Sequence, residues 1–466
     1  MPDAKPPTIF FSVGEPSGDL HGANLIRQLQ SRSPGLRAVG YGGPIMAEAG
    51  CQLHTDLTAL AVMWIARVLV NLHKFWGLVS RADRYFRHHR PDAVVLIDYP
   101  GFNWWIARRA KVHGIPVFYY TPPQIWAWAQ WRVKKMRRLV DHVLCSLPFE
   151  ESWFRRHGCN ATFVGHPFFD EVRRYPYDEQ FIRQHRCEPG PLVVILPGSR
   201  TQEVSHNLKW FLKAAALIHE KVPDVRFALA SFKPHQAEIA RQMIADVARR
   251  GQSHFRGEEV DSQGDADAAA KIGTVPSGLP VEICVGKTPE LMRLADCAMS
   301  VSGSVSLELL YHTTPTVVLY WVNRFAYFVQ GFFRKVKYIT LVNLLANGGL
   351  EEECRDLEDA RRGLGTSVPS AVGSEEGSGF RVQDSVLFPE YLTCEDKSAQ
   401  IAGHVIQWLT DPAKRAARVE ALARLKEEVA HGGASSRAAE YILAALARRP
   451  RCVPRPHFRP LAVGAR

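Results

Sequence analysis

The sequence lacks the features of several classes of protein. Its nine cysteines stand singly, with no CxxC pair and an odd total, which argues against a disulfide framework and a zinc site and favours a reducing cytoplasm. No stretch reaches the roughly 18 uncharged apolar residues that a membrane-spanning helix needs. The opening MPDAKPPTIFFSV has too few apolar residues for a signal peptide. We therefore expect a protein that is soluble or peripheral to a membrane.

Motifs for cofactors and for nucleic acid are also missing. The sequence has no G-x-G-x-x-G fingerprint, no GxxxxGK[ST] phosphate loop, and no HxxxH or HExxH pair. Nothing in it matches a recognition helix, an RNP motif or a zinc finger. We expect no metal, no cofactor and no nucleic-acid partner.

What is present is an ordinary globular composition with a basic balance. The chain has 466 residues, of which 46% are hydrophobic, so two domains with proper cores are the natural expectation. Its formal net charge of +11 suits an anionic partner such as a nucleotide or a phospholipid surface.

The hydrophobic pattern predicts an α/β fold made of two doubly wound parallel sheets. Near-continuous apolar runs alternate with helical patterns up to about residue 165, and a second such series starts at PLVVILPGSR (191–200). Three helical patterns end the chain. The expected domains are 1–168, 190–390 and the helices of 396–448, with polar surface insertions at 258–278 and 365–380.

The stretch FFSVGEPSGDLHG places a tight turn between the first strand and the first helix. The turn carries Gly14, Glu15, Ser17, Gly18 and Asp19. It is either a structural corner or a ligand site, since ligands of open α/β sheets bind at the carboxyl ends of the strands. Two carboxylates there suit sugar hydroxyls or acid/base chemistry better than a phosphate.

A third carboxylate ends a buried strand in VVLIDYPGFN. Asp98 is expected at the same edge of the sheet as Glu15. It is interpreted as a base in a cleft; the alternative is an N-cap for a helix that starts near Asn103.

Two motifs of the second half indicate a nucleotide. In ILPGSRTQEV, residues Gly198, Ser199, Arg200 and Glu203 lie where a strand turns into a helix, and the guanidinium matches phosphate oxygens. In SVSGSVSLELL the candidates are Ser302, Gly303, Ser304 and Glu308, whose carboxylate can accept hydrogen bonds from ribose hydroxyls. His166 in GHP, near the junction of the halves, is expected either to touch ligand or to cap a turn.

The segment IARVLVNLHKFWGLV predicts an amphipathic helix over 64–80. Such a helix either faces the core or lies in a membrane surface. Basic clusters at 81–90 and 131–138 would add attraction to anionic lipid. The residues of the apolar face are Ile65, Val68, Leu69, Leu72, Phe75 and Trp76.

The motifs GEPSGDLHGANLI, LIDYPGFN, PPQIWAW, FVGHP, LPGSR, SGSVSLE and LVNLLA, in this order over about residues 8–350, resemble the lipid-A-disaccharide synthase family. The resemblance implies the GT-B fold, two Rossmann-like domains facing a cleft, and an inverting glycosyltransferase without a metal. It implies UDP-2,3-diacylglucosamine as donor, 2,3-diacylglucosamine 1-phosphate as acceptor, and a β-1,6-linked disaccharide plus UDP as products. The implied location is the cytoplasmic face of the inner membrane.

The resemblance also implies roles for these residues. Gly198, Ser199 and Arg200 would address the diphosphate, Glu308 the ribose, and Asn343 would line the pocket. Asp98 would take the proton from the acceptor 6-hydroxyl, while Glu15 and Asp19 bind or orient sugar. Members exchange C-terminal segments in a dimer, so a homodimer is a further expectation that this longer tail leaves open.

The chain departs from the family at Tyr320-Trp321, where relatives carry Tyr-Arg, so a basic contact is either missing or supplied by Arg324. The rivals are a transferase acting on a lipid-linked muropeptide, a nonhydrolysing UDP-GlcNAc epimerase and a non-catalytic membrane-bound UDP-sugar sensor. The first would carry a G-G-T-G-G-H-type opening, the second needs no acyl-binding helix, and the third can dispense with Asp98.

Overall fold

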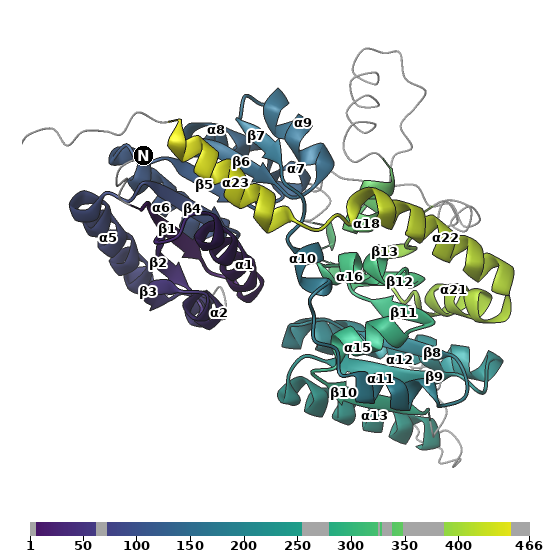
Figure 1. Cartoon of the computed structure of the whole chain (residues 1–466). Coiled ribbons are helices and arrows are strands. Elements are labelled where there is room, and N and C mark those ends of the chain that lie inside the picture. The colour runs from purple at the N-terminus through teal and green to yellow at the C-terminus, as the bar shows by residue number, and fades with distance from the viewer. Residues whose placement is uncertain are drawn as a thin grey trace, which may run out of the picture.

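The protein folds into two lobes, each built around a parallel β-sheet (Figure 1). The computed structural model describes residues 6–61, 72–253, 279–324, 327–328, 338–347 and 386–448. The predicted insertions at 258–278 and 365–380 and the predicted membrane contacts Ile65, Val68 and Leu69 lie outside these residues.

The first sheet has the strand order β3-β2-β1-β4-β5-β6-β7, and every described pairing in it is parallel. Its strands are β1 (Thr8–Val13), β2 (Arg37–Gly42), β3 (Cys51–Asp56), β4 (Ala93–Ile97), β5 (Val117–Tyr120), β6 (His142–Cys145) and β7 (Ala161–Phe163). Its helices are α1 (Pro16–Arg32), α2 (Pro44–Glu48), α3 (Thr58–Ala61), α5 (Leu72–His89), α6 (Pro100–Val112), α7 (Ile125–Trp128), α8 (Val133–Leu139) and α9 (Pro148–Arg156), with a 3₁₀ turn, η1 (Gln130–Arg132), before α8.

The second sheet repeats this plan with the order β10-β9-β8-β11-β12-β13, again with parallel pairings. Its strands are β8 (Leu192–Leu196), β9 (Arg226–Ser231), β10 (Val281–Val285), β11 (Cys297–Ser300), β12 (Thr316–Trp321) and β13 (Glu390–Thr393). Its helices are α12 (Thr201–Lys221), α13 (Pro234–Ser253), α15 (Thr288–Leu294), α16 (Val305–Tyr311) and α18 (Leu341–Ala346).

Two short helices, α10 (Phe168–Val172) and α11 (Glu179–Arg186), connect the lobes. At the end of the chain, α21 (Ser398–Thr410) and α22 (Pro412–Val429) pack on the second lobe. The last helix, α23 (Ala434–Ala447, yellow in Figure 1), returns to the first lobe and packs against α1. Its N-terminus is held there by the Asp170 carboxylate, which accepts a hydrogen bond from the Ser435 N–H at 2.9 Å. The chain therefore crosses between the lobes twice, and the predicted boundaries at 168, 190 and 390 remain a proposal.

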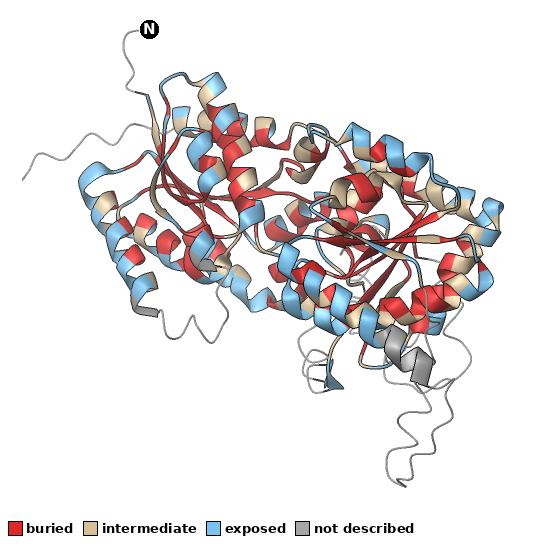
Figure 2. Ribbon diagram, turned by 90° about the horizontal axis from the view of Figure 1, so that it is seen from below, coloured by how far each residue is buried: buried red, intermediate tan, exposed pale blue. Residues whose placement is uncertain are grey.

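The central strands are buried on both faces because helices cover both sides of each sheet (Figure 2). One face of the first sheet packs against α5, α6, α8 and α9, and the other against α1, α2 and α23. The lobes also meet directly, since Leu344 of α18 joins the apolar cluster of the first lobe. The predicted class, two doubly wound parallel sheets with helices at the end of the chain, is confirmed.

Sequence patterns missed four strands, β3, β7, β10 and β13, and all four are the edge strands of their sheets. An edge strand is short and partly exposed, so it does not show the continuous apolar run of a central strand. The helix expected from residue 103 begins instead at Pro100, because a proline fits the first helical position, where no N–H is needed.

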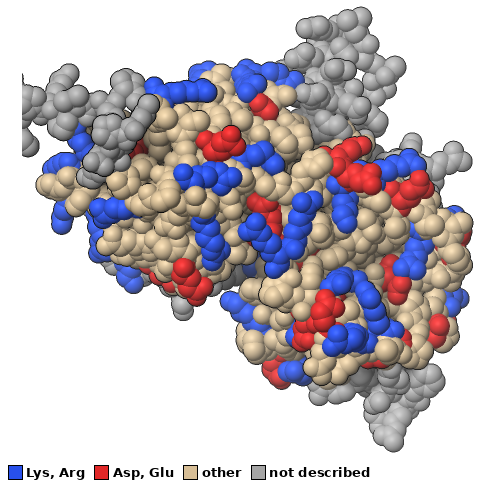
Figure 3. Space-filling view, in the orientation of Figure 1, with Lys and Arg blue, Asp and Glu red and all other residues tan. Residues whose placement is uncertain are grey.

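Within the described residues, no helix is both long enough and apolar enough to cross a membrane. Lys and Arg side chains are spread over both lobes on the face drawn in Figure 3, interspersed with acidic ones. The net positive charge therefore does not form one continuous patch on that face.

Candidate active site

The two candidate carboxylates of the first lobe lie at the point where its strand order reverses. Glu15 follows β1 and Asp98 follows β4, and these strands are neighbours in the sheet. The connections after β1 and β4 lead to opposite sides, so a crevice opens between them at the carboxyl ends of the strands. The sequence predicted this shared edge.

Two glycines of the first turn let the loop after β4 approach it closely. A Cβ at Gly14 would lie 2.4 Å from Cδ1 of Tyr99, and a Cβ at Gly18 would lie 2.9 Å from Cγ1 of Val13 and 3.4 Å from Oδ2 of Asp98. The Asp98 carboxylate thus lies against the first turn of α1. Larger residues at either glycine would push the two loops apart.

The Asp98 backbone is held in an unfavourable conformation by a buried network. Asp98 and Tyr99 have φ of 47° and 43°, in the left-handed region that residues with a Cβ seldom adopt. The Asp98 carbonyl accepts hydrogen bonds from Asn103 Nδ2 at 2.8 Å and from the Tyr119 hydroxyl at 2.6 Å. Ser12 completes the network by donating to Asn103 Oδ1 at 2.7 Å. Strain of this kind persists where the surroundings over-determine it, often at functional sites.

The Asp98 side chain takes no part in that network. The N-cap of α6 is Tyr99, and no side chain caps the helix, so the alternative that Asp98 is an N-cap is not what the structure has. Burial raises the pKa of Asp98 to about 6, with Glu15 adding to the rise and His21 opposing it. Asp98 is therefore ionised at neutral pH and yet basic enough to accept a proton.

His21 and Glu171 join this site from either side of the lobe junction, and the sequence motifs did not single out either residue. His21 Nδ1 lies 2.6 Å from Glu171 Oε1 of α10. Burial lowers the pKa of His21, but the hydrogen bond and charge of Glu171, together with Asp98 and Asp170, outweigh it and raise that pKa. His21 lies one turn after Gly18 on α1, and that spacing was the available signal.

His166 is a neutral neighbour of this pair. Its ring lies edge-on to His21 with 6.2 Å between centroids, and its Nδ1 accepts a hydrogen bond from the Phe168 N–H at 3.3 Å. Burial and the charge of His21 lower the pKa of His166 to about 3. The ring caps the turn that enters α10, one of the two roles that the sequence left open.

Asp19 serves the fold rather than facing the crevice. Its carboxylate accepts hydrogen bonds from the backbone N–H groups of Gly43, Ile45 and Met46 at 2.9, 3.0 and 3.1 Å. It therefore satisfies the otherwise unpaired start of α2. This engagement assigns Asp19 to positioning α2 against α1, and the predicted contact with sugar stays a prediction.

In the second lobe, the LPGSR loop follows β8 at the equivalent reversal of strand order, between β8 and β11. Glu203 Oε2 accepts hydrogen bonds from the N–H groups of Ser199 and Arg200 at 3.1 and 3.2 Å, which closes the start of α12. Gly198, with φ of 123°, allows this because a Cβ there would lie 2.4 Å from Glu203 Cβ. Glu203 thus holds the loop, and the exposed Arg200 side chain places its Nη1 3.7 Å from Oε1 of Glu203.

The SGSVSLE motif lies beside this loop, after β11. Ser302 donates to the Ile339 carbonyl at 2.8 Å, so its hydroxyl is engaged, whereas Gly303 and Ser304 are exposed at the start of α16. Glu308 is half-buried, and burial raises its pKa to about 8, with Glu171 and Glu290 adding to the rise. A carboxyl group that is largely protonated at neutral pH can both donate and accept hydrogen bonds.

Asn343 is fully buried and takes part in the packing of α18. Its Nδ2 donates to the Phe388 carbonyl at 2.7 Å and to Glu390 at 2.9 Å, and its Oδ1 accepts from the Phe388 N–H at 2.9 Å. Every polar atom of the side chain is therefore used inside the protein. The pocket-lining role that the family resemblance implied for Asn343 stays a prediction.

At Trp321, where relatives carry arginine, the ammonium group of Lys209 lies close to the indole ring. The Trp321 ring lies 6.2 Å from that of Trp210, and Lys209 Nζ lies 4.8 Å from its centroid. The Trp321 N–H of the backbone donates to Asn207 at 3.0 Å. Lys209 is therefore a basic residue in contact with Trp321, and a contact supplied by Arg324 stays a prediction.

Charged residues at the carboxyl ends of the two sheets interact electrostatically with Glu171 of α10, directly or through His21. Asp98 of the first lobe and Glu171 both act on the charge of His21, and Glu171 acts in turn on Glu308 of the second lobe. Residues at the carboxyl ends of both sheets therefore lie near α10. Such a site can hold an anionic group on one lobe and activate a nucleophile on the other.

Comparisons with known proteins agree on a family. The family model described as "Lipid-A-disaccharide synthetase" matches residues 9–289 and 277–362. The lipid-A-disaccharide synthases of Geobacter sulfurreducens and Syntrophus aciditrophicus are each 31% identical to this chain, over 93% and 92% of it and 96% of each relative.

Solved structures share the fold. A glycotransferase of kitacinnamycin is 16% identical with a TM-score of 0.54, covering 95% of this chain and 99% of that one. A UDP-N-acetylglucosamine 2-epimerase is 11% identical with a TM-score of 0.54, covering 96% and 98%. The chain belongs to the lipid-A-disaccharide synthase family, and it is a GT-B glycosyltransferase of lipid A disaccharide synthesis.

Proposed function

We propose that this enzyme transfers 2,3-diacylglucosamine from UDP to the 6-hydroxyl of 2,3-diacylglucosamine 1-phosphate, with inversion at the anomeric carbon. The observation that carries the proposal is that a candidate group lies at the strand-order reversal of each sheet. Asp98 lies at the reversal of the first sheet, and the exposed Arg200 lies at that of the second. Members of the family and the basic balance of the chain support a sugar-nucleotide donor and a lipid acceptor.

In this proposal the second lobe holds UDP. At Gly198 and Ser199 the backbone lets the diphosphate approach closely, and Arg200 binds it. Gly303 and Ser304, on the neighbouring loop, add hydrogen-bond donors. Glu308 accepts and donates hydrogen bonds to the ribose hydroxyls. The leaving diphosphate is stabilised by arginine and by the N-terminus of the long helix α12, which favours negative charge.

The first lobe holds the acceptor. Asp98 removes the proton from the 6-hydroxyl as that oxygen attacks the anomeric carbon on the side opposite the departing UDP. One base and one stabilised leaving group are enough for inversion, so the step needs no covalent nucleophile. Glu15 and Ser17, at the start of α1, orient the acceptor sugar, and the nearby His21 opposes the rise in the pKa of Asp98.

We also propose that the first lobe contacts an anionic membrane at the cytoplasmic face. Trp76 of α5 and Trp105 of α6 are 43% and 40% exposed, and their rings lie 4.7 Å apart. Exposed basic residues include Lys74, two residues before Trp76, and the cluster on α8, a helix that packs against α6. An amphipathic aromatic pair beside cations suits the interface between lipid headgroups and acyl chains. Phe75, in contrast, packs into the core.

The decisive assay measures UDP release from UDP-2,3-diacylglucosamine with and without the monosaccharide 1-phosphate, together with the lipid product. Acceptor-dependent UDP release and a β-1,6 disaccharide are expected. An epimerase would convert UDP-GlcNAc without an acceptor, and a sensor would bind the donor without releasing UDP. A homodimer remains part of the proposal and is tested by the mass of the protein in solution.

A further inference from the structure

Three side chains that can bind metal gather on the second lobe, away from the proposed reaction site. They are His185 of α11 and Glu282 and Cys284 of β10, and their ligand atoms all lie within 4.8 Å of one another. Glu282 and Cys284 are two residues apart on a strand, so they point to the same face, toward α11. Strand β9 separates this edge strand from β8 and the LPGSR loop.

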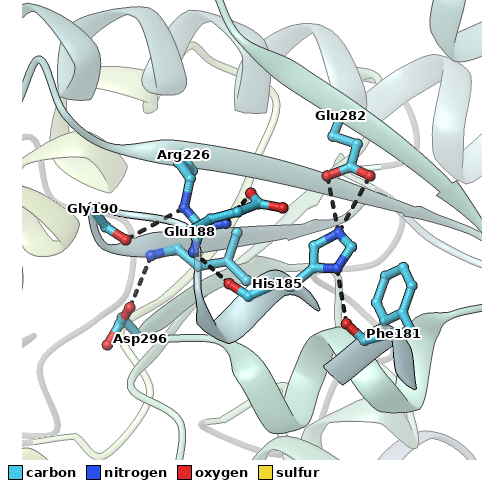
Figure 4. A network of polar contacts seen from close by, with 8 residues as sticks. Phe181, His185, Glu188, Gly190, Arg226, Glu282 and Asp296 are labelled. Atoms are coloured by element: carbon cyan, nitrogen blue, oxygen red, sulfur yellow. Dashed lines mark hydrogen bonds and ion pairs between the residues drawn. The ribbon is translucent and has the colours of Figure 1, made fainter. Parts of the chain in front are cut away.

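The hydrogen bonding of His185 fixes which ring nitrogen is free. Its Nδ1 lies 3.0 Å from the Phe181 carbonyl, which can only accept, so Nδ1 carries the hydrogen (Figure 4). Its Nε2 faces the Glu282 carboxylate at 3.2 and 3.3 Å. In a neutral ring, Nε2 and the carboxylate are both acceptors, so the pair is stable only with a proton or a metal ion between them. A histidine that donates from its other nitrogen to a carbonyl is the usual arrangement of a metal ligand.

Cys284 adds a sulfur to the same pocket. The residue is buried, and its Sγ lies within 4.8 Å of the ligand atoms of His185 and Glu282. A bound cation would replace the thiol proton, because metal ligation deprotonates cysteine. The nearby Glu188 carboxylate is paired with Arg226, so its charge is already balanced (Figure 4).

We propose that His185, Glu282 and Cys284 bind one zinc ion, with water in the fourth position. Imidazole, carboxylate and thiolate are the ligands that Zn²⁺ prefers, and their two negative charges balance its charge. The Glu282 side chain is 53% exposed, which gives the ion a path from solvent. The ion would fasten the edge strand β10 to the connecting helix α11. This site is independent of the proposed transfer reaction.

The test uses the full-length protein, freed of metal by a chelator and kept reduced by a phosphine. Cobalt is added first, because a thiolate ligand gives it a charge-transfer absorption band, and zinc is then titrated to displace it. We expect the charge-transfer absorbance to saturate at one cobalt ion per chain and to disappear when one equivalent of zinc is added. We also expect the temperature of half-unfolding to be higher with zinc bound. Zinc affinity is measured by competition with a chromophoric chelator.

Variants distinguish zinc binding at this site from zinc binding at other cysteines and histidines of the chain. Cys284→Ser should abolish the band, and His185→Gln and Glu282→Gln should each weaken zinc binding about tenfold or more. Cys187→Ser is the matched control, because Cys187 is exposed and lies two residues from His185; it should change nothing. The exposed position of Glu282 makes Glu282→Gln a variant that keeps the fold. The proposal is overturned if the wild type shows no band, or if the band and affinity survive both Cys284→Ser and Glu282→Gln.

Discussion

The pH dependence of turnover offers a sharp test of Asp98 as the base. Its pKa is raised to about 6, so the ionised fraction is about nine-tenths at pH 7 and about one-tenth at pH 5. Because the base acts only when ionised, activity should be full above pH 7 and fall through pH 6, reaching a slope of about tenfold per unit below it. The quantity to measure is kcat/KM for the acceptor at saturating donor, from pH 5 to 9. Saturating donor keeps the titration of Glu308 out of the profile.

Two variants should shift the acid limb of the pH profile, the fall in kcat/KM below pH 7, in opposite directions. His21 carries positive charge that lowers the Asp98 pKa, so His21→Gln should shift the limb to higher pH. Glu15 raises that pKa, so Glu15→Gln should shift the limb to lower pH, whatever it does to sugar binding. Glu171→Gln should act like His21→Gln, because it removes the partner whose hydrogen bond and charge raise the pKa of His21. A limb that stays fixed in all three variants, or one that lies near pH 4 in the wild type, would refute the reasoning.

Three further predictions follow from single contacts. Arg200→Ala should weaken UDP binding, measured by calorimetry, about ten- to hundredfold, because charge-assisted hydrogen bonds contribute about 1.5–3 kcal/mol. Arg241→Ala, which replaces an exposed arginine of α13, is the control and should bind UDP with the wild-type affinity. Asp19→Ala leaves three backbone N–H groups without an acceptor and should lower the free energy of unfolding by about 1–3 kcal/mol in urea melts, with Asp19→Asn losing less because it keeps one oxygen. Replacing Trp76 and Trp105 together by Ser should reduce sedimentation with anionic vesicles while Phe232→Ser, an exposed aromatic of the second lobe, does not; equal binding by all three proteins would remove the tryptophan pair from the membrane contact.

The sequence predicted the two sheets and the site residues that directly follow their central strands. Buried runs such as those ending at Ile97 and Leu196 gave both sheets, and the carboxyl ends of those strands gave the places of Asp98 and Arg200. The edge strands β3, β7, β10 and β13 were missed because each is half-solvated and carries no continuous apolar run.

Which polar residues serve the fold could not be read from local patterns. Asp19, Glu203 and Asn343 occur in loop and helix motifs that suit a ligand, yet their partners are backbone groups of the protein itself. The partner of Asn343 lies 45 residues away in the chain, and that of His21 lies 150 residues away. Only the folded arrangement brings such groups together, so neither the pairing of His21 with Glu171 nor the His185–Glu282–Cys284 group could be predicted from local spacing.

The most direct measurement of the central claim, that the base and the UDP site lie on different lobes, compares UDP affinity with turnover in the Asp98→Asn enzyme. The account predicts UDP affinity within about twofold of the wild type and turnover lower by about a hundredfold or more at pH 8. Wild-type turnover in this variant, or a loss of UDP affinity that matches the loss of turnover, would contradict it.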